Sequence, residues 1–113
     1  RKGFRKSAND TAKIMKRAGY IETDVGAALR DSFGMNSKSA AKLMKSLGFE
    51  PVAIGNVLRN TFGKNKKEMV KVLNKELKYG KGQTKDIMQD MGYKKSDIKG
   101  AFKSVFGKVK GLF

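Results

Sequence analysis

Lysine and arginine are the residues of this sequence whose number and distribution favour a particular chemistry, the binding of anions. The chain of 113 residues contains 26 Lys and Arg against 10 Asp and Glu, so its formal net charge is +16 at pH 7. A surplus this large repels itself, and it favours an anionic partner over a purely solvated surface. Outside the C-terminal segment, the cations that we predict to contact this partner are Lys66, Lys67, Lys71, Lys75, Lys78, Arg30 and Arg59.

The C-terminal segment combines cations with an apolar stripe. From residue 97 to residue 113, apolar side chains recur at the spacing of one helix face, from Ile98 to Phe113. Such a helix lies in a membrane interface or packs in the domain core, and both hold if it leaves the bundle on contact with lipid. The contact residues that we predict here are Lys94, Lys95, Lys99, Phe102, Lys103, Phe106, Lys108, Lys110 and Phe113.

Catalytic chemistry has little support in the sequence. The chain has no Cys, His or Trp, which excludes disulfides, thiolate nucleophiles, imidazole acid–base chemistry and the usual zinc ligands. Most acidic residues stand where helices are expected to begin, and the pair Asp86 and Asp90 is more simply part of an exposed face. The glycines do not form a phosphate-binding loop. We therefore predict neither an enzyme nor a bound cofactor or metal.

The elements that position these residues come from an internal repeat. The segments 14–34, 43–63 and 87–107 share one frame, in which a Gly precedes an aromatic residue and a Phe-Gly pair follows fourteen residues after that Gly. The Gly-aromatic pair is typical of a helix C-terminus followed by a hinge. We expect Phe33, Phe62 and Phe106 to be buried at equivalent places, and Gly26 and Gly55 to allow close helix contacts.

Each repeat unit predicts two short helices, and the extra segment adds one more. The units cover about residues 11–35, 40–64 and 84–108, and the inserted helix covers about 66–79. Because a lone helix between two-helix units reverses the stacking of the third unit, we expect a compact bundle rather than a continuous superhelix. The fold class predicted for the single domain 1–113 is therefore all-α, with about seven short helices.

Two resemblances accompany this frame. The segment 88–93, Met-Gln-Asp-Met-Gly-Tyr, resembles the loop of ubiquitin-associated domains, which need a third helix where each unit here has two. The frame is also similar to the two-helix repeats of about thirty residues in some large secreted bacterial proteins. These positions have low specificity, so the resemblance names no family.

Two partner classes remain. The first is an anionic membrane surface or cell-envelope polymer, bound by a cationic protein of the antimicrobial or toxin kind. The alternative is nucleic acid, bound without sequence specificity through phosphates. Lys outnumbers Arg 21 to 5 and no aromatic is clearly left over to stack on bases, which favours the membrane.

Location and assembly depend on the same choice. The large first residue Arg1 is typical of a proteolytically processed end or an artificial boundary, so we expect a secreted or released protein. The nucleic-acid alternative predicts a cytoplasmic or nucleoid-associated one instead. No apolar stretch approaches the length of a spanning helix, and the oligomeric state is open.

Overall fold

The computed structural model describes residues 2–107, 111 and 113, and within them it is all-helical, with seven helices and no strand. Two of the helices change to π-helical turns in their second half. The elements are α1 (Lys2–Arg17), α2 (Glu22–Asp31), α3 (Ser37–Ser46), α4 (Pro51–Asn56) with η1 (Val57–Thr61), α5 (Lys66–Lys71) with η2 (Val72–Glu76), α6 (Lys81–Asp90) and α7 (Lys95–Phe106).

Local sequence explains where the helices begin. Pro51 occupies the first turn of α4, where its missing N–H costs no hydrogen bond. Asn36 accepts a bond from the N–H of Ser39, and Asn65 forms a reciprocal capping box with Glu68. The second helix of each unit begins without a side-chain cap. Its N-cap residue is Ile21, Glu50 or Lys94, and none of these side chains forms a capping hydrogen bond.

The three hinge glycines have the same backbone geometry, which confirms the repeat at these positions. The φ angles of Gly19, Gly48 and Gly92 are +85°, +86° and +96°, a region that glycine adopts without strain. In each unit the aromatic N–H bonds back to a methionine carbonyl at 3.1 Å, in the pairs Tyr20–Met15, Phe49–Met44 and Tyr93–Met88. The last turn of each first helix is thereby closed in the same way.

The inserted helix is a further copy of the second helix of a unit. Its last turn ends at Lys78, whose φ of +61° matches those of Gly34 (+61°) and Gly63 (+64°). Residue 79 bonds back to the carbonyl six residues earlier, Leu73, at 3.0 Å, as Lys64 does to Leu58 at 2.9 Å. The Val-Leu pairs at 57–58 and 72–73 carry this kinship in the sequence. The insertion therefore places two helices of the second type in succession.

The core is built from the middle of the second helices, not from their ends. Leu29, Leu58 and Phe102 stand at equivalent positions and are each 0% exposed. Four residues later, Phe33, Phe62 and Phe106 pack against the core at equivalent places, as predicted, but they are partly buried instead of buried. They lie at the end of α7 or just beyond the ends of α2 and η1, where they pack against the rim of the core.

The C-terminal helix is shorter than its apolar pattern suggests. It ends at Phe106, and Gly107 follows with a φ of +80°. A single helix from residue 97 to residue 113 is therefore wrong, because the left-handed glycine turns the chain out of the helical path. Ile98 and Phe102 are fully buried, which places the apolar face of α7 in the core.

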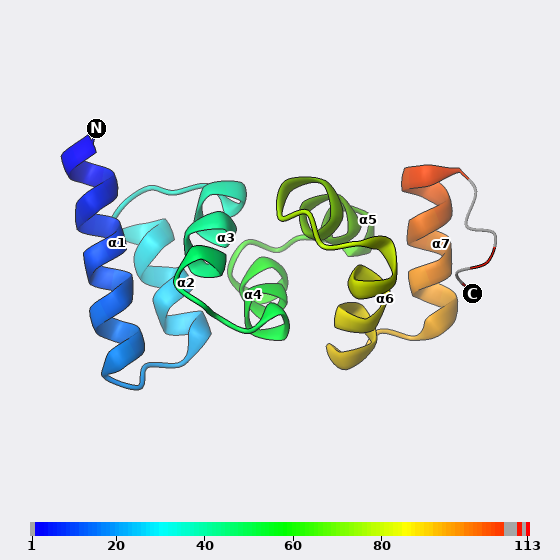
Figure 1. Cartoon of the computed structure of the whole chain (residues 1–113), viewed down its shortest axis with the longest axis horizontal. Helices are drawn as coiled ribbons and strands as arrows, with labels where there is room; N and C mark the ends of the chain where they lie inside the picture. Colours follow the sequence, from blue (N-terminus) through cyan, green and yellow to red (C-terminus); the bar gives the residue numbers. More distant parts are fainter. Residues whose placement is uncertain (1, 108–110, 112) are drawn as a thin grey trace.

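The seven helices form a compact bundle with dimensions of 44 × 27 × 20 Å, and they follow one another along its long axis (Figure 1). The first helix, α1, and the last, α7, lie at opposite ends. Successive helices such as α1 and α2 are in contact, and in addition α2 packs on α4, α4 on α6 and α5 on α7. The predicted close helix contacts are confirmed: a Cβ on Gly26 would lie 2.6 Å from Val57 Cγ1, and one on Gly55 2.4 Å from Met91 Sδ.

Candidate anion-contact surfaces

Two groups of predicted cations lie next to each other because α5 packs on α7. On α5, Lys66, Lys67 and Lys71 are exposed, and on α7 so are Lys95, Lys99 and Lys103, with Lys94 immediately before the helix. A groove of about 350 Å³ runs between the two helices and is lined by Asn65, Lys66, Lys67, Ser96, Asp97, Gly100, Ala101 and Ser104. Lys66 Nζ pairs with Asp97 across it, at 3.3 Å.

The predicted aromatic contacts of the C-terminal segment are engaged in the fold. Phe102 is 0% exposed, and its ring meets those of Phe106 and Phe113 edge to face, at centroid distances of 5.5 and 5.4 Å. Lys81 Nζ lies 4.4 Å from the Phe106 ring and Lys85 Nζ 5.1 Å from the Phe113 ring. The predicted contacts Lys108 and Lys110 lie outside the described residues.

Arg30 and Arg59, which recur at one frame position, bind neighbouring helix ends. Arg30 donates to the Thr61 carbonyl at 2.6 Å and pairs with Asp31 at 2.7 Å. Its side-chain hydrogen bond lowers the pKa of the Asp31 carboxyl. Arg59 donates to the Met91 carbonyl at 3.1 Å and stacks on the Tyr93 ring at 5.3 Å. Much of the hydrogen-bonding capacity of both groups is therefore used inside the protein.

The same arrangement recurs along the molecule, and we call it a junction. In a junction, a cation on one helix contacts the end of the helix two places later in the chain, as Arg30 of α2 contacts the end of α4 with η1. Lys45 of α3 donates to the Leu77 carbonyl after η2 and lies 4.6 Å from the Tyr79 ring. Lys16 of α1 lies 5.5 Å from the Phe49 ring after α3. The geometry suits the negative end of a helix and the negative face of an aromatic ring. Lys75 of η2 lies 6.0 Å from the ring of Phe106, the last residue of α7. Five junctions among the described residues join the helices in this way.

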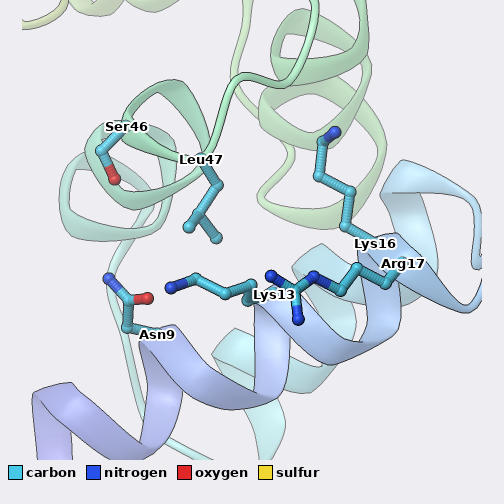
Figure 2. Close-up of a pocket in the computed structure, with 6 residues that line it drawn as sticks. All are labelled: Asn9, Lys13, Lys16, Arg17, Ser46 and Leu47. Atoms are coloured by element: carbon cyan, nitrogen blue, oxygen red, sulfur yellow. The ribbon is translucent and has the colours of Figure 1, made fainter.

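Sequence reasoning missed a third group of cations, on α1. Lys13, Lys16 and Arg17 are exposed and line a pocket of about 580 Å³ together with Asn9, Ser46 and Leu47. Figure 2 shows Lys13 and Arg17 beside each other along α1, with Ser46 and Leu47 supplied by α3. The i, i+3, i+4 spacing of the three cations was the available signal, because it places them on one side of a helix.

Exposed apolar side chains accompany these α1 cations. Ile14, Tyr20 and Ile21, which we call the apolar trio, are 65%, 55% and 60% exposed. At the equivalent interior positions, Ile87 is 5% exposed, and Phe49 and Tyr93 are partly buried under Lys16 and Arg59. Ile14 and Tyr20 belong to the end of the described row of helices that α1 forms (Figure 1), whereas Ile21 stands at the position of Glu50 and Lys94, which are exposed as well.

Three further observations concern metal ligands, a buried phenol and membrane-spanning helices among the described residues. Within it, no three Asp or Glu side chains gather closely enough to hold a metal ion. The pKa of Tyr79 is raised mainly by burial, which keeps this phenol neutral. Nor does any of the described helices combine the length and apolarity needed to cross a membrane.

Similarity to known proteins adds nothing to this geometry: no family model, no curated protein and no solved structure matches the chain. A functional argument therefore depends on three surface features, which are the α5–α7 groove, the α1 pocket and the apolar trio.

Proposed function

We propose that this protein binds anionic membrane surfaces peripherally, with the α1 end of the molecule facing the lipid. The observation that carries the proposal is the coincidence of the exposed apolar trio with Lys13, Lys16 and Arg17 on the same helix and its hinge. Ile14 and Arg17 are three residues apart, so they are neighbours on the helix surface. Permeabilisation of anionic membranes, as by an antimicrobial protein or toxin, is the activity expected if many copies bind.

The two energetic contributions support each other at this end. Burying about 100 Å² on each trio side chain would contribute on the order of 2.5 kcal/mol per residue at ~25 cal/mol per Å². Each cation near an anionic surface adds about 1 kcal/mol, and this part is screened by salt. Apolar burial persists at high salt, so membrane binding should have a salt-resistant part.

The α7 end is a weaker candidate for lipid contact than its sequence suggests. Ile98 and Phe102 are 0% exposed, so inserting them would first require α7 to leave the core. Exposing a fully buried Phe side chain costs about 2 to 3 kcal/mol before any gain from the membrane. The α1 end offers apolar surface with no such unfolding step.

Nucleic acid is the second candidate, and it is favoured by a different surface. The α5–α7 groove has lysines and serines along its walls and Gly100 in its lining, which leaves room for a close approach of a phosphate backbone. The groove has no exposed aromatic side chain among its lining residues, so this binding would use phosphates alone. The logarithm of its affinity for nucleic acid should fall with the logarithm of the salt concentration, at a slope of about −0.9 per phosphate neutralised.

A crossed comparison of two double variants tests both candidates. Binding to anionic vesicles, zwitterionic vesicles and duplex DNA is measured at ~0.15 M salt, where diffuse attraction is already limited, and again at high salt. We expect Ile14→Gln with Ile21→Gln to remove the salt-resistant vesicle binding, and Lys99→Gln with Lys103→Gln to leave it intact. Tight DNA binding that only the lysine variant weakens, with vesicle binding lost completely at high salt, would replace the membrane proposal by the nucleic-acid one.

A further inference from the structure

The junction between α1 and α3 differs from three of the other junctions of the molecule. In those three, a cation has an internal acceptor: Arg30 meets the Thr61 carbonyl, Lys45 the Leu77 carbonyl and Arg59 the Met91 carbonyl. Two of these junctions also hold a carboxylate. Arg30 pairs with Asp31, and Lys38 of α3 pairs with Glu76, the last residue of η2, at 3.2 Å.

At the α1–α3 junction there are three cations and no such carboxylate. Within the described residues, no acid lies within salt-bridge distance of Lys13, Lys16 or Arg17. Helix α3 ends in Ser46, where η2 ends in Glu76. The position that supplies a negative charge at one junction is therefore neutral at the other.

Part of the α3 end is satisfied without these cations, because Leu47, Gly48 and Phe49 donate their N–H groups back to residues 43 to 45. The Leu47 carbonyl corresponds to the Met91 and Leu77 carbonyls of the other junctions, but none of Lys13, Lys16 and Arg17 is hydrogen-bonded to it. The Ser46 hydroxyl donates to the Leu43 carbonyl at 2.6 Å. Lys13 and Arg17 are thus left facing a pocket of about 580 Å³ with unused donors.

We infer that the pocket between α1 and α3 is a phosphate-binding site in which an external anion takes the place of the missing carboxylate. The Arg17 guanidinium offers paired donors that match phosphate oxygens, the Lys13 ammonium adds a point charge, and the Asn9 amide offers further donors. The same chemistry recognises a lipid headgroup phosphate and a free phosphate. The inference rests on the proposed membrane contact for the lipid source only.

Titration with inorganic phosphate at constant ionic strength, followed by amide NMR shifts, tests the site without a membrane. We expect saturable shifts around residues 13–17 and 46–48. Lys13→Gln with Arg17→Gln should weaken this binding at least about tenfold, a loss of ~1.4 kcal/mol. The control Lys99→Gln with Lys103→Gln carries the same net charge and should leave it unchanged. Equal weakening by both pairs, or shifts that do not saturate, would overturn the site.

Substitutions at Ser46 test the site independently, because they add a carboxylate to the pocket instead of removing cations from it. Ser46→Glu restores the carboxylate that Glu76 provides at the other junction, so it should abolish phosphate binding, whereas Ser46→Gln should retain it. Retention of phosphate binding in a folded Ser46→Glu protein would contradict the inference. Both variants fill the same exposed position with side chains of similar size, so a loss of fold common to both would be seen in the control.

Vesicles containing a phosphomonoester lipid separate this inference from the proposed function. If free phosphate binds at the pocket but no vesicle is bound, the site stands and the membrane proposal fails. If free phosphate does not bind but vesicles are still bound through the trio, the membrane proposal stands and the site fails. Weaker binding of these vesicles by the Lys13→Gln, Arg17→Gln variant, with the trio intact, supports both.

Discussion

At the end of the molecule formed by α7, aromatic side chains are covered and lysines lie over their rings, whereas the end formed by α1 leaves the apolar trio exposed and its cations without carboxylates. Phe113 packs on Phe102 and closes the α7 end. The α1 end is formed by the first helix of one unit and the α7 end by the second helix of another, so the two ends present different faces of the repeat. An exposed apolar face is a surface on which a partner can bind.

The largest expected effect comes from removing a covered aromatic at one end and an exposed one at the other. Phe102→Ala leaves a cavity at a fully buried position, and we expect it to lower the free energy of unfolding by about 3 to 5 kcal/mol. Tyr20→Ala should lower it by less than about 0.5 kcal/mol, because that ring is 55% exposed. Urea unfolding of both variants measures the contrast, and similar losses would mean that the trio is covered in solution.

Two glycines near equivalent positions should respond with opposite signs. Gly55→Ala places a Cβ 2.4 Å from Met91 Sδ, so this flexible side chain must shift within a buried site, and we expect the protein to be destabilised by about 1 kcal/mol. Gly100→Ala meets nothing within 4 Å in the middle of α7, and the better helix propensity of alanine should stabilise by about 0.5 to 1 kcal/mol. Thermal unfolding gives both signs in one experiment. Stabilisation by Gly55→Ala would show that α4 and α6 are farther apart.

The cation that recurs at one frame position should contribute to stability only where the end of a later helix lies against it. Arg59→Gln removes a donor to the Met91 carbonyl and a ring contact with Tyr93, and we expect a loss of about 1 to 2 kcal/mol. Lys103→Gln stands at the same frame position on the exposed face of α7, and its effect should stay within about 0.5 kcal/mol. Denaturant midpoints compare the two. Equal effects would remove the junction from the stability of the fold.

The smallest effect concerns the pH dependence of stability at the junction between α2 and η1. The hydrogen bond from Arg30 lowers the pKa of Asp31, so the folded state favours the ionised carboxylate. Its contribution to stability is present above the ordinary carboxyl pKa and is lost as the pH falls through the lowered, folded value. Carboxyl NMR should find the Asp31 midpoint below its ordinary value, and Arg30→Gln should return it there. An unchanged midpoint in Arg30→Gln would assign the shift to another group.

Much of the local structure follows from residue pattern. The hinge glycines, Pro51 and the close contact at Gly26 act through backbone sterics, which depend on a few neighbouring residues. The kinship of α5 with the second helices is also visible in sequence, through Val72 and Leu73. The surface that we now favour was not predicted, because nothing local distinguishes Tyr20 from Phe49 and Tyr93, which share its frame position.

The sequence by itself determined an all-α chain, its repeat frame, its hinge glycines and its net positive charge, because helix periodicity, glycine geometry and net charge are local or additive properties. Only the tertiary structure decided which of the residues at equivalent frame positions are buried. It buried the apolar face of α7 in the core, assigned Arg30 and Arg59 to helix ends, and left Ile14 and Lys13 open at α1. Burial depends on which helix lies against which, and that order is set by packing of the whole row.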